Sequence, residues 1–221
     1  MKVIITGSTG MVGKGALLEC IDDPRVEKIL LINRSSIDIR NPKVEEVLLK
    51  DFSDFSPIQS QMQGYDLCIH CMGVSAAGLS EEKYTQLTFG VTQSLASTLH
   101  EINPDMVFYY VSGQGTDSTE NGKVMWARVK GRAENRVFQI GFKDAYAFRP
   151  SMIIPERGIK SRTGWYNAIY FVMRPFFPLM KKSKAVTTTQ RIGQAMITLY
   201  FNPRTNKYLS GEDINAFAGN D

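Results

Sequence analysis

The sequence predicts an α/β fold, a doubly wound parallel sheet with helices on both faces and a small C-terminal lobe. Two observations support this prediction. Short apolar runs alternate with longer segments of helical periodicity over the first 150 residues, which is the order of successive βαβ units. A glycine-rich turn directly follows the first apolar run. Beyond residue 150 the alternation stops, and glycine, proline and aromatic residues become dense.

The elements of the first 150 residues follow one another in this order. Six apolar runs are predicted as strands, over residues 3–6, 28–32, 44–49, 66–70, 106–111 and 145–148. Helical periodicity predicts helices over 11–21, 80–101 and 123–141, and a weak helical segment over 54–63. Ser80 precedes Glu82 and Lys83, a sequence typical of a helix N-terminus.

The rest of the chain is expected to complete the same domain. A last helix is predicted over 189–201, with Thr187, Thr188 or Thr189 as its N-cap. A short strand over 207–209 and a terminal helical turn follow. We therefore expect a single domain over 1–221, divided into a core over 1–150 and the C-terminal lobe over 150–221.

The composition excludes several classes of protein. With 43% apolar and 22% charged residues, the chain has the balance of a globular domain, not of a disordered or fibrous one. Cys68 and Cys71 lie on a predicted strand, where positions three apart point to opposite faces, so they form a poor metal clip. Only two histidines occur, and we expect no metal site. Three free cysteines and the lack of an export signal predict a cytoplasmic location.

The net charge of +4 is concentrated in one segment. Residues 157–184 hold seven basic residues and no acidic one, so the remainder carries a net charge of −3. We therefore expect no nucleic-acid partner. Within this segment, residues 165–180 are apolar and aromatic, which fits the wall of a pocket with a basic rim. Contact with a membrane or an acidic partner through 157–184 is the alternative. The sequence leaves a monomer and a homodimer open.

The glycine-rich turn is the most informative motif. Thr6-Gly7-Ser8-Thr9-Gly10-Met11-Val12-Gly13 follows the first strand and opens the first helix. Glycines at 7, 10 and 13 let the backbone turn tightly and approach a pyrophosphate, while the helix N-terminus presents free N–H groups to it. Since strand, turn and helix come in the required order, the motif predicts dinucleotide binding.

The Gly-x-x-Gly-x-x-Gly spacing resembles that of the extended and atypical short-chain dehydrogenases/reductases. Other strand ends agree with this resemblance: Asn33-Arg34, Lys50-Asp51-Phe52, Cys71-Met72-Gly73, Val111-Ser112-Gly113 and Phe148-Arg149-Pro150. The resemblance covers residues 1–150 strongly and the remainder loosely, and it is greatest to the small epimerase-like group of the 30 kDa Tat-interacting protein. It implies an NAD(P)-binding Rossmann fold with oxidoreductase or epimerase-like activity, and a lobe that contacts a small-molecule substrate of unknown identity.

The resemblance and the turn together give a set of candidate cofactor-binding residues. They are Gly7, Ser8, Thr9, Gly10, Met11, Val12, Gly13, Asn33, Arg34, Ser35, Asp51, Phe52, Met72, Gly73, Lys130, Arg149 and Pro150. In NAD-selective Rossmann proteins an acidic residue at the end of the second strand binds the ribose 2′-hydroxyl. Here Asn33 holds that position and Arg34 follows it, with Ser35 and Ser36 as further donors and Lys14 as a second cation. We therefore expect NADP in preference to NAD.

The candidate catalytic residues are Ser112, Lys130 and Trp126. In the family that the sequence resembles, a Tyr-x-x-x-Lys pair follows the fifth strand, and a serine at the strand end binds the substrate carbonyl. Ser112 and Lys130 hold the serine and lysine places, but Trp126 holds that of the tyrosine. An indole N–H donates a hydrogen bond and cannot shuttle a proton at neutral pH.

Two hypotheses follow from the missing tyrosine. In the first, the protein is an NADP(H)-dependent oxidoreductase or epimerase-like enzyme whose acid comes from Tyr84, Tyr166 or a water held by Ser112. In the second, it binds NADP(H) with weak or no hydride chemistry, as a redox sensor or a partner-binding protein.

Overall fold

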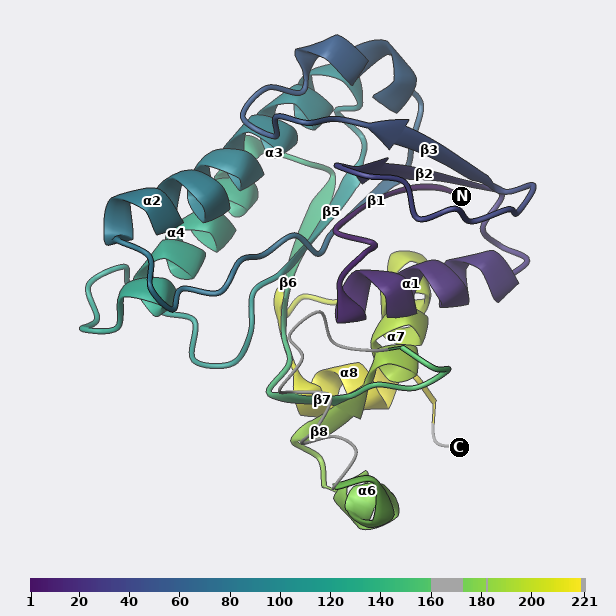
Figure 1. The fold of residues 1–221 in the computed structure, drawn as a ribbon, viewed down its shortest axis with the longest axis vertical. Coiled ribbons are helices and arrows are strands. Elements are labelled where there is room, and N and C mark those ends of the chain that lie inside the picture. The colour runs from purple at the N-terminus through teal and green to yellow at the C-terminus, as the bar shows by residue number, and fades with distance from the viewer. Residues whose placement is uncertain (160–172, 182, 220–221) are drawn as a thin grey trace.

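A computed structural model describes residues 1–159, 173–181 and 183–219. Its centre is a seven-stranded sheet in the order β3-β2-β1-β4-β5-β6-β9 (Figure 1). The strands are β1 (Lys2–Thr6), β2 (Lys28–Asn33), β3 (Val44–Leu48), β4 (Leu67–His70), β5 (Val107–Val111), β6 (Asp144–Arg149) and β9 (Tyr208–Ser210). Every neighbouring pair is parallel. The predicted fold class is confirmed.

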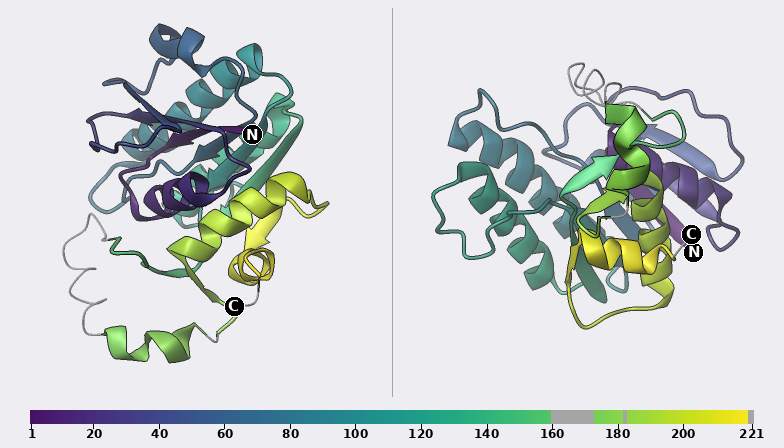
Figure 2. Two further views of the ribbon diagram at one scale, coloured as in Figure 1. Left: turned by 90° about the vertical axis from the view of Figure 1, so that its right-hand side faces the viewer. Right: turned by 90° about the horizontal axis from the view of Figure 1, so that it is seen from below.

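Helices cover both faces of this sheet (Figures 1 and 2). On one face lie α1 (Met11–Asp22), α7 (Thr189–Phe201) and α8 (Gly211–Phe217). On the other lie α3 (Val91–Ile102), α4 (Met125–Ile140) and the short helix η1 (Ser56–Met62). Successive strand residues alternate between the two cores, so the inner strands are apolar throughout. Ile5 packs in the α1 core and Ile4 in the α3 core.

The same alternation separates the two cysteines of the Cys-x-x-Cys pair. Cys68 is buried in the core beneath α3, whereas Cys71 packs against the core beneath α1. The prediction that they point to opposite faces is confirmed.

The helix predicted over 80–101 has three parts. It consists of α2 (Glu81–Thr85), a π-helical turn η2 (Gln86–Gly90) and α3. Ser80 is the N-cap, and its side chain accepts a hydrogen bond from the Lys83 N–H. The wider π turn changes which side chains face the cleft described below.

The main sheet continues past the boundary predicted at residue 150. β9 is its edge strand, α7 packs against α1, and Thr188 caps α7 as one of the three predicted threonines. A separate two-stranded parallel sheet, formed by β7 (Met152–Ile154) and β8 (Val186–Thr188), was not predicted. The short helices η3 (Arg174–Phe176) and α6 (Phe177–Met180) lie between these two strands in the sequence. Residues 160–172 of the predicted lobe are outside the described part.

No helix in the described part of the chain is both long and apolar enough to cross a lipid bilayer.

Candidate active site

A cavity of about 390 Å³ opens at the carboxyl ends of the central strands. This is the edge at which open α/β sheets bind ligands. Ten of the predicted cofactor-binding residues line it: Gly7, Thr9, Gly10, Asn33, Arg34, Ser35, Asp51, Phe52, Met72 and Gly73. The structure therefore brings residues from four separate strand ends around one space.

The glycine turn forms one wall of the cavity through close backbone packing. Gly7 has a φ of +75°, and a Cβ there would lie 2.7 Å from the carbonyl group of Cys71. A Cβ at Gly13 would lie 2.3 Å from the carbonyl oxygen of Gly7. Neither position can hold a side chain, so both glycines are required for the turn to close onto β4 and α1. Gly10, the N-cap of α1, faces the cavity itself.

At the end of β2, a carboxylate organises the polar side chains. Ser8 Oγ donates to Asn33 Oδ1 at 2.9 Å, and Asn33 Nδ2 donates to Glu46 Oε1 at 2.7 Å. Ser36 Oγ and the Ile37 N–H also donate to Glu46. Burial of Glu46 works against ionisation, but these hydrogen bonds lower its pKa. The Ser36 hydroxyl, expected to face the cofactor, is instead bound to Glu46.

Arg34 and Ser35 follow this network and line the cavity. Across the described residues, Arg34 forms neither a hydrogen bond nor an ion pair, and it is exposed. Asp51 also lines the cavity, and its pKa is lowered by the hydrogen bond from the Ser53 N–H. Within the described residues, the rim thus carries the Asp51 carboxylate and two cations, Arg34 and Lys50, that have neither a hydrogen-bond nor an ion-pair partner.

The structure adds lining residues that the sequence did not suggest as site residues. Lys50 lies beside Asp51, and the opposite wall is formed by Lys83, Gln86, Leu87 and Val91 from α2, η2 and α3. Lys83, Leu87 and Val91 are four residues apart, a spacing that places them on one helix face. That stripe was the available signal, but nothing in the sequence indicated that it faces the cleft.

The predicted catalytic residues meet at the end of β5. Lys130 Nζ donates to the Ser112 carbonyl oxygen, and it lies 6.0 Å from the centre of the Trp126 ring. The Ser112 hydroxyl is buried, donates to Glu134 Oε1 at 2.5 Å, and lies 3.3 Å from the Phe148 carbonyl oxygen. The three residues are therefore close together, but the serine hydroxyl is held by a carboxylate within the protein.

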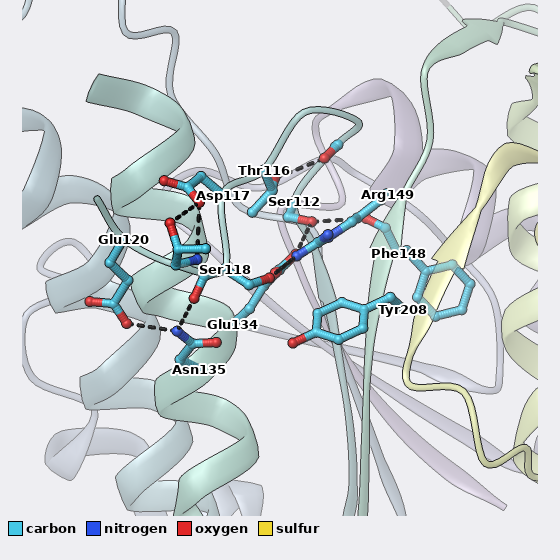
Figure 3. Close-up of polar contacts among 12 residues, drawn as sticks. Ser112, Thr116, Asp117, Ser118, Glu120, Glu134, Asn135, Phe148, Arg149 and Tyr208 are labelled. Atoms are coloured by element: carbon cyan, nitrogen blue, oxygen red, sulfur yellow. Dashed lines mark hydrogen bonds and ion pairs between the residues drawn. The ribbon is translucent and has the colours of Figure 1, made fainter. Parts of the chain in front are cut away.

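Glu134 lies at the centre of this cluster and was not among the residues predicted from the sequence (Figure 3). It is fully buried, and the Arg149 guanidinium contacts both of its carboxylate oxygens, with Nε at 3.0 Å from Oε1. Arg149 also donates to Ser118 Oγ at 2.5 Å and stacks on the Tyr208 ring at 4.2 Å. The available signal for Glu134 was its position four residues after Lys130, because residues i and i+4 share a helix face.

The remaining candidate cofactor-binding residues do not line the described cavity. Arg149 is occupied by Glu134, and the Pro150 carbonyl oxygen accepts from the Gln114 N–H. Ser8 is buried beneath the turn, while Met11, Val12 and Gly13 form the first turn of α1. These residues therefore lie behind the residues that line the cavity.

The sequence suggested three groups that could replace the missing tyrosine as proton donor. Tyr84 is 1% exposed, and its burial raises its pKa. The Ser112 hydroxyl, invoked to hold a water, is directed at Glu134. Tyr166 lies outside the described residues.

No protein-family model matches the chain. Among curated proteins, it is 24% identical over 177 residues to the HTATIP2 protein of Rattus norvegicus, covering 79% of this chain and 72% of that protein. It is 23% identical over 159 residues to the mitochondrial protein FMP52 of Meyerozyma guilliermondii, covering 71% and 67% respectively. The match to the leucinostatins biosynthesis cluster protein T of Purpureocillium lilacinum is 26% identical and covers 79% and 64%. The chain thus spans about two thirds of the length of these relatives, and less than that of the last.

Solved structures share the fold over nearly the whole chain. Yeast methylglyoxal/isovaleraldehyde reductase Gre2, complexed with NADPH, superposes with a TM-score of 0.68 at 12% identity, covering 95% of this chain and 77% of that one. The Bordetella bronchiseptica enzyme WbmH, in complex with NAD+, gives 0.66 at 13% identity, covering 94% and 74%. The predicted resemblance is confirmed. The fold is that of NAD(P)-dependent reductases and epimerases, and the HTATIP2 and FMP52 relatives are consistent with an atypical short-chain dehydrogenase/reductase.

The predicted cytoplasmic location is wrong as stated. Several relatives carry the name FMP52 and are described as mitochondrial, including those of Debaryomyces hansenii and Aspergillus niger. The prediction rested partly on free cysteines. Cys20 and Cys68 are buried, and burial raises the pKa of Cys20 to about 12, so these cysteines form a weak basis for assigning a compartment.

Proposed function

We propose that the protein is an NADP(H)-dependent oxidoreductase with an altered active site, which reduces the carbonyl group of a small molecule. The observation that carries the proposal is Arg34, a cation at the rim of the glycine-turn cavity that has no hydrogen-bond or ion-pair partner among the described residues. Glu46, which lies beside the end of β2, is bound by Asn33, Ser36 and the Ile37 N–H. The cofactor-bound Gre2 structure supports the choice of a reductase.

The residues present fit a dinucleotide. Gly7 and Gly13 let the turn close tightly, because a Cβ at either position would meet protein backbone. The first turn of α1 then begins at Met11, directly after the Gly10 N-cap that lines the cavity, and its N–H groups would face the pyrophosphate. Arg34 and Ser35 would hold a 2′-phosphate, while Asp51 and Phe52 would border the adenine. The cofactor would supply a hydride when bound. The protein's residues orient it and provide the proton.

A test of this function measures dinucleotide binding in an Arg34→Ala variant. A hydrogen bond to a charged group contributes roughly 1.5–3 kcal/mol. Loss of Arg34 should therefore weaken NADPH binding on the order of ten- to a hundredfold and leave NADH binding almost unchanged. Calorimetric titration of both cofactors into both proteins measures the two ratios, with Lys14→Ala as a control for a nearby cation outside the cavity lining. Equal losses for both cofactors would contradict the NADP assignment.

A second function is favoured by Trp126, which stands where a proton donor is expected. In that case the protein binds NADP(H) without turnover and acts as a redox sensor or a partner-binding protein. Single-turnover absorbance of bound NADPH with several aldehydes and ketones separates the two functions. Binding without oxidation favours the sensor.

A further inference from the structure

The reaction proposed above leaves one proton without a donor. Trp126 cannot supply it, because an indole N–H is not acidic at neutral pH. Tyr84 is buried, and the Ser112 hydroxyl is bound to Glu134. His70 is 1% exposed and lies between two threonine hydroxyls. A different group at the end of β5 is therefore needed.

The Lys130 ammonium group lies at the end of β5 and has N–H donors available for a substrate. Its half-buried ammonium group donates to the Ser112 carbonyl oxygen, its hydrogen-bond acceptor within the described residues. An ammonium group has three N–H donors, so two have no acceptor in that part of the protein. Gly113 leaves room beside it, since a Cβ there would lie 3.9 Å from Nζ. Trp126, one helical turn earlier on α4, borders the same space.

We propose that Lys130 is the general acid of this protein and takes over the proton transfer that the missing tyrosine would perform. The proposal rests on the proposed function. A bound reduced nicotinamide would supply hydride, and with it two electrons, to the carbonyl carbon. The carbonyl oxygen then needs one proton to become a hydroxyl group. Lys130 Nζ gives that proton, becomes a neutral amine and regains a proton from water.

The surroundings of Lys130 favour this role. Burial lowers the pKa of the amine, and the Glu134 carboxylate opposes part of that shift. Glu134 is itself paired with Arg149 from β6. Trp126 adds a flat apolar wall with no competing charge. A lysine in such a place exchanges its proton closer to neutral pH than a solvated one.

The experiment compares Lys130→Arg with Lys130→Met in the full-length protein. Arginine keeps the positive charge and the hydrogen bond to Ser112, but it does not lose a proton in proteins. If Lys130 only holds the cofactor, the Lys130→Arg variant keeps the turnover of the parent protein. If it is the acid, both variants lose roughly 10²–10⁴-fold in turnover, while Lys130→Arg changes the Kd for NADPH by less than about tenfold. The probes are isovaleraldehyde, methylglyoxal and 4-nitrobenzaldehyde, and Tyr84→Phe is the control that retains turnover.

A second readout does not depend on turnover. NMR of the protein carrying lysine labelled with 13C at Cε follows the titration of Lys130 directly, and Lys130→Met assigns its signal. We expect a pKa below that of solvated lysine, equal to the pKa at which the rate falls as pH rises. A mismatch between the two values would overturn the proposal. So would full turnover in Lys130→Arg, or activity that Tyr166→Phe alone abolishes.

The outcomes also separate this proposal from the function on which it rests. Absence of NADPH binding in calorimetry overturns both. Tight NADPH binding without oxidation by any of the three probes overturns the role of Lys130 and leaves the sensor function standing.

Discussion

His70 is a buried histidine whose two ring nitrogens are both bound. Thr6 Oγ1 lies 2.7 Å from Nδ1, and Thr92 Oγ1 lies 3.0 Å from Nε2. Since Thr92 Oγ1 donates its own hydrogen to the Thr88 carbonyl oxygen, it accepts from Nε2–H, and Nδ1 accepts from Thr6. The ring is stacked on Tyr110, and burial lowers the pKa of His70 to about 3. Folded His70 is therefore neutral.

This burial predicts that acid destabilises the protein at a higher pH than carboxylates alone would. The pKa of His70 is about 3 when folded and about 6.5 when unfolded, so the unfolded state binds more protons between these values. The free energy of unfolding should fall by up to about 1.4 kcal/mol per pH unit as pH drops below 6.5. Urea unfolding at pH 7.5, 6.0 and 5.0 measures it. The slope should vanish in His70→Gln and persist in His100→Gln, and an unchanged slope in the first variant would assign the effect to other groups.

At the scale of secondary-structure elements, the loop between β5 and α4 is held against α4 by close packing. A Cβ at Gly131 would lie 1.8 Å from the carbonyl oxygen of Asp117 in this loop. Asn135 Nδ2 donates to the Ser118 carbonyl oxygen one turn further along the helix, and Arg149 donates to the Ser118 hydroxyl (Figure 3). The loop contains Gly113 and follows Ser112, so this contact fixes the strand end on which Lys130 rests.

Gly131→Ala should therefore destabilise the protein although alanine favours helices. The added methyl group meets backbone that cannot yield without moving the loop, and overpacking costs typically 1–3 kcal/mol, occasionally more. Gly90→Ala is the matched control, since its Cβ would have one neighbour, at 3.9 Å. That substitution should be neutral or stabilise by up to about 1 kcal/mol. Thermal unfolding should show a Tm several degrees lower for Gly131→Ala alone, and equal Tm values would mean that the loop adjusts freely.

The first 150 residues were predictable because each element there is determined locally. Short apolar runs predicted the strands, 3.6-residue periodicity predicted the helices, and the glycine turn located the cleft. β7 and β8 were missed because they pair across more than thirty residues of chain, and no local pattern indicates such a pairing. The Glu134–Arg149 pair was missed for a related reason, since only the sheet brings α4 and β6 together. Motif matching selected Ser8 and Pro150 as candidate cofactor-binding residues. It could not show that neither of them lines the cavity.

At the scale of the whole molecule, several basic residues of the segment 157–184 form ion pairs with carboxylates outside the segment. Arg157 pairs with Glu19 at 2.9 Å and with Asp22 at 2.8 Å. Two further cations of the segment pair with body acids, Lys181 with Glu156 and Lys184 with Glu212. Lys160, Arg162 and Lys182 lie outside the described residues. Three of the seven basic residues are thus paired with carboxylates, although Lys184 and Glu212 stay largely exposed.

These ion pairs bear on whether the segment docks to a membrane. α6 lies at the edge of the molecule, away from the main sheet (Figures 1 and 2). Phe176 at the end of η3 and Leu179 on α6 are 59% and 69% accessible. Stable binding to an anionic surface needs apolar contact together with unpaired basic residues. Three of the basic residues are already in ion pairs. We therefore predict that the protein does not co-sediment with vesicles of anionic and zwitterionic lipid at about 0.15 M salt.

Vesicle co-sedimentation can also show why binding is absent. A Glu156→Gln and Glu212→Gln double variant frees Lys181 and Lys184 without adding charge to the apolar surface, and it should bind anionic vesicles at low salt more strongly than the parent. Neutral vesicles should bind neither protein. If instead the parent binds anionic vesicles at 0.15 M salt, and Phe176→Ser with Leu179→Ser abolishes that binding, the segment is a membrane-docking surface. The pocket-wall interpretation then fails, because side chains inserted into lipid cannot also enclose a substrate.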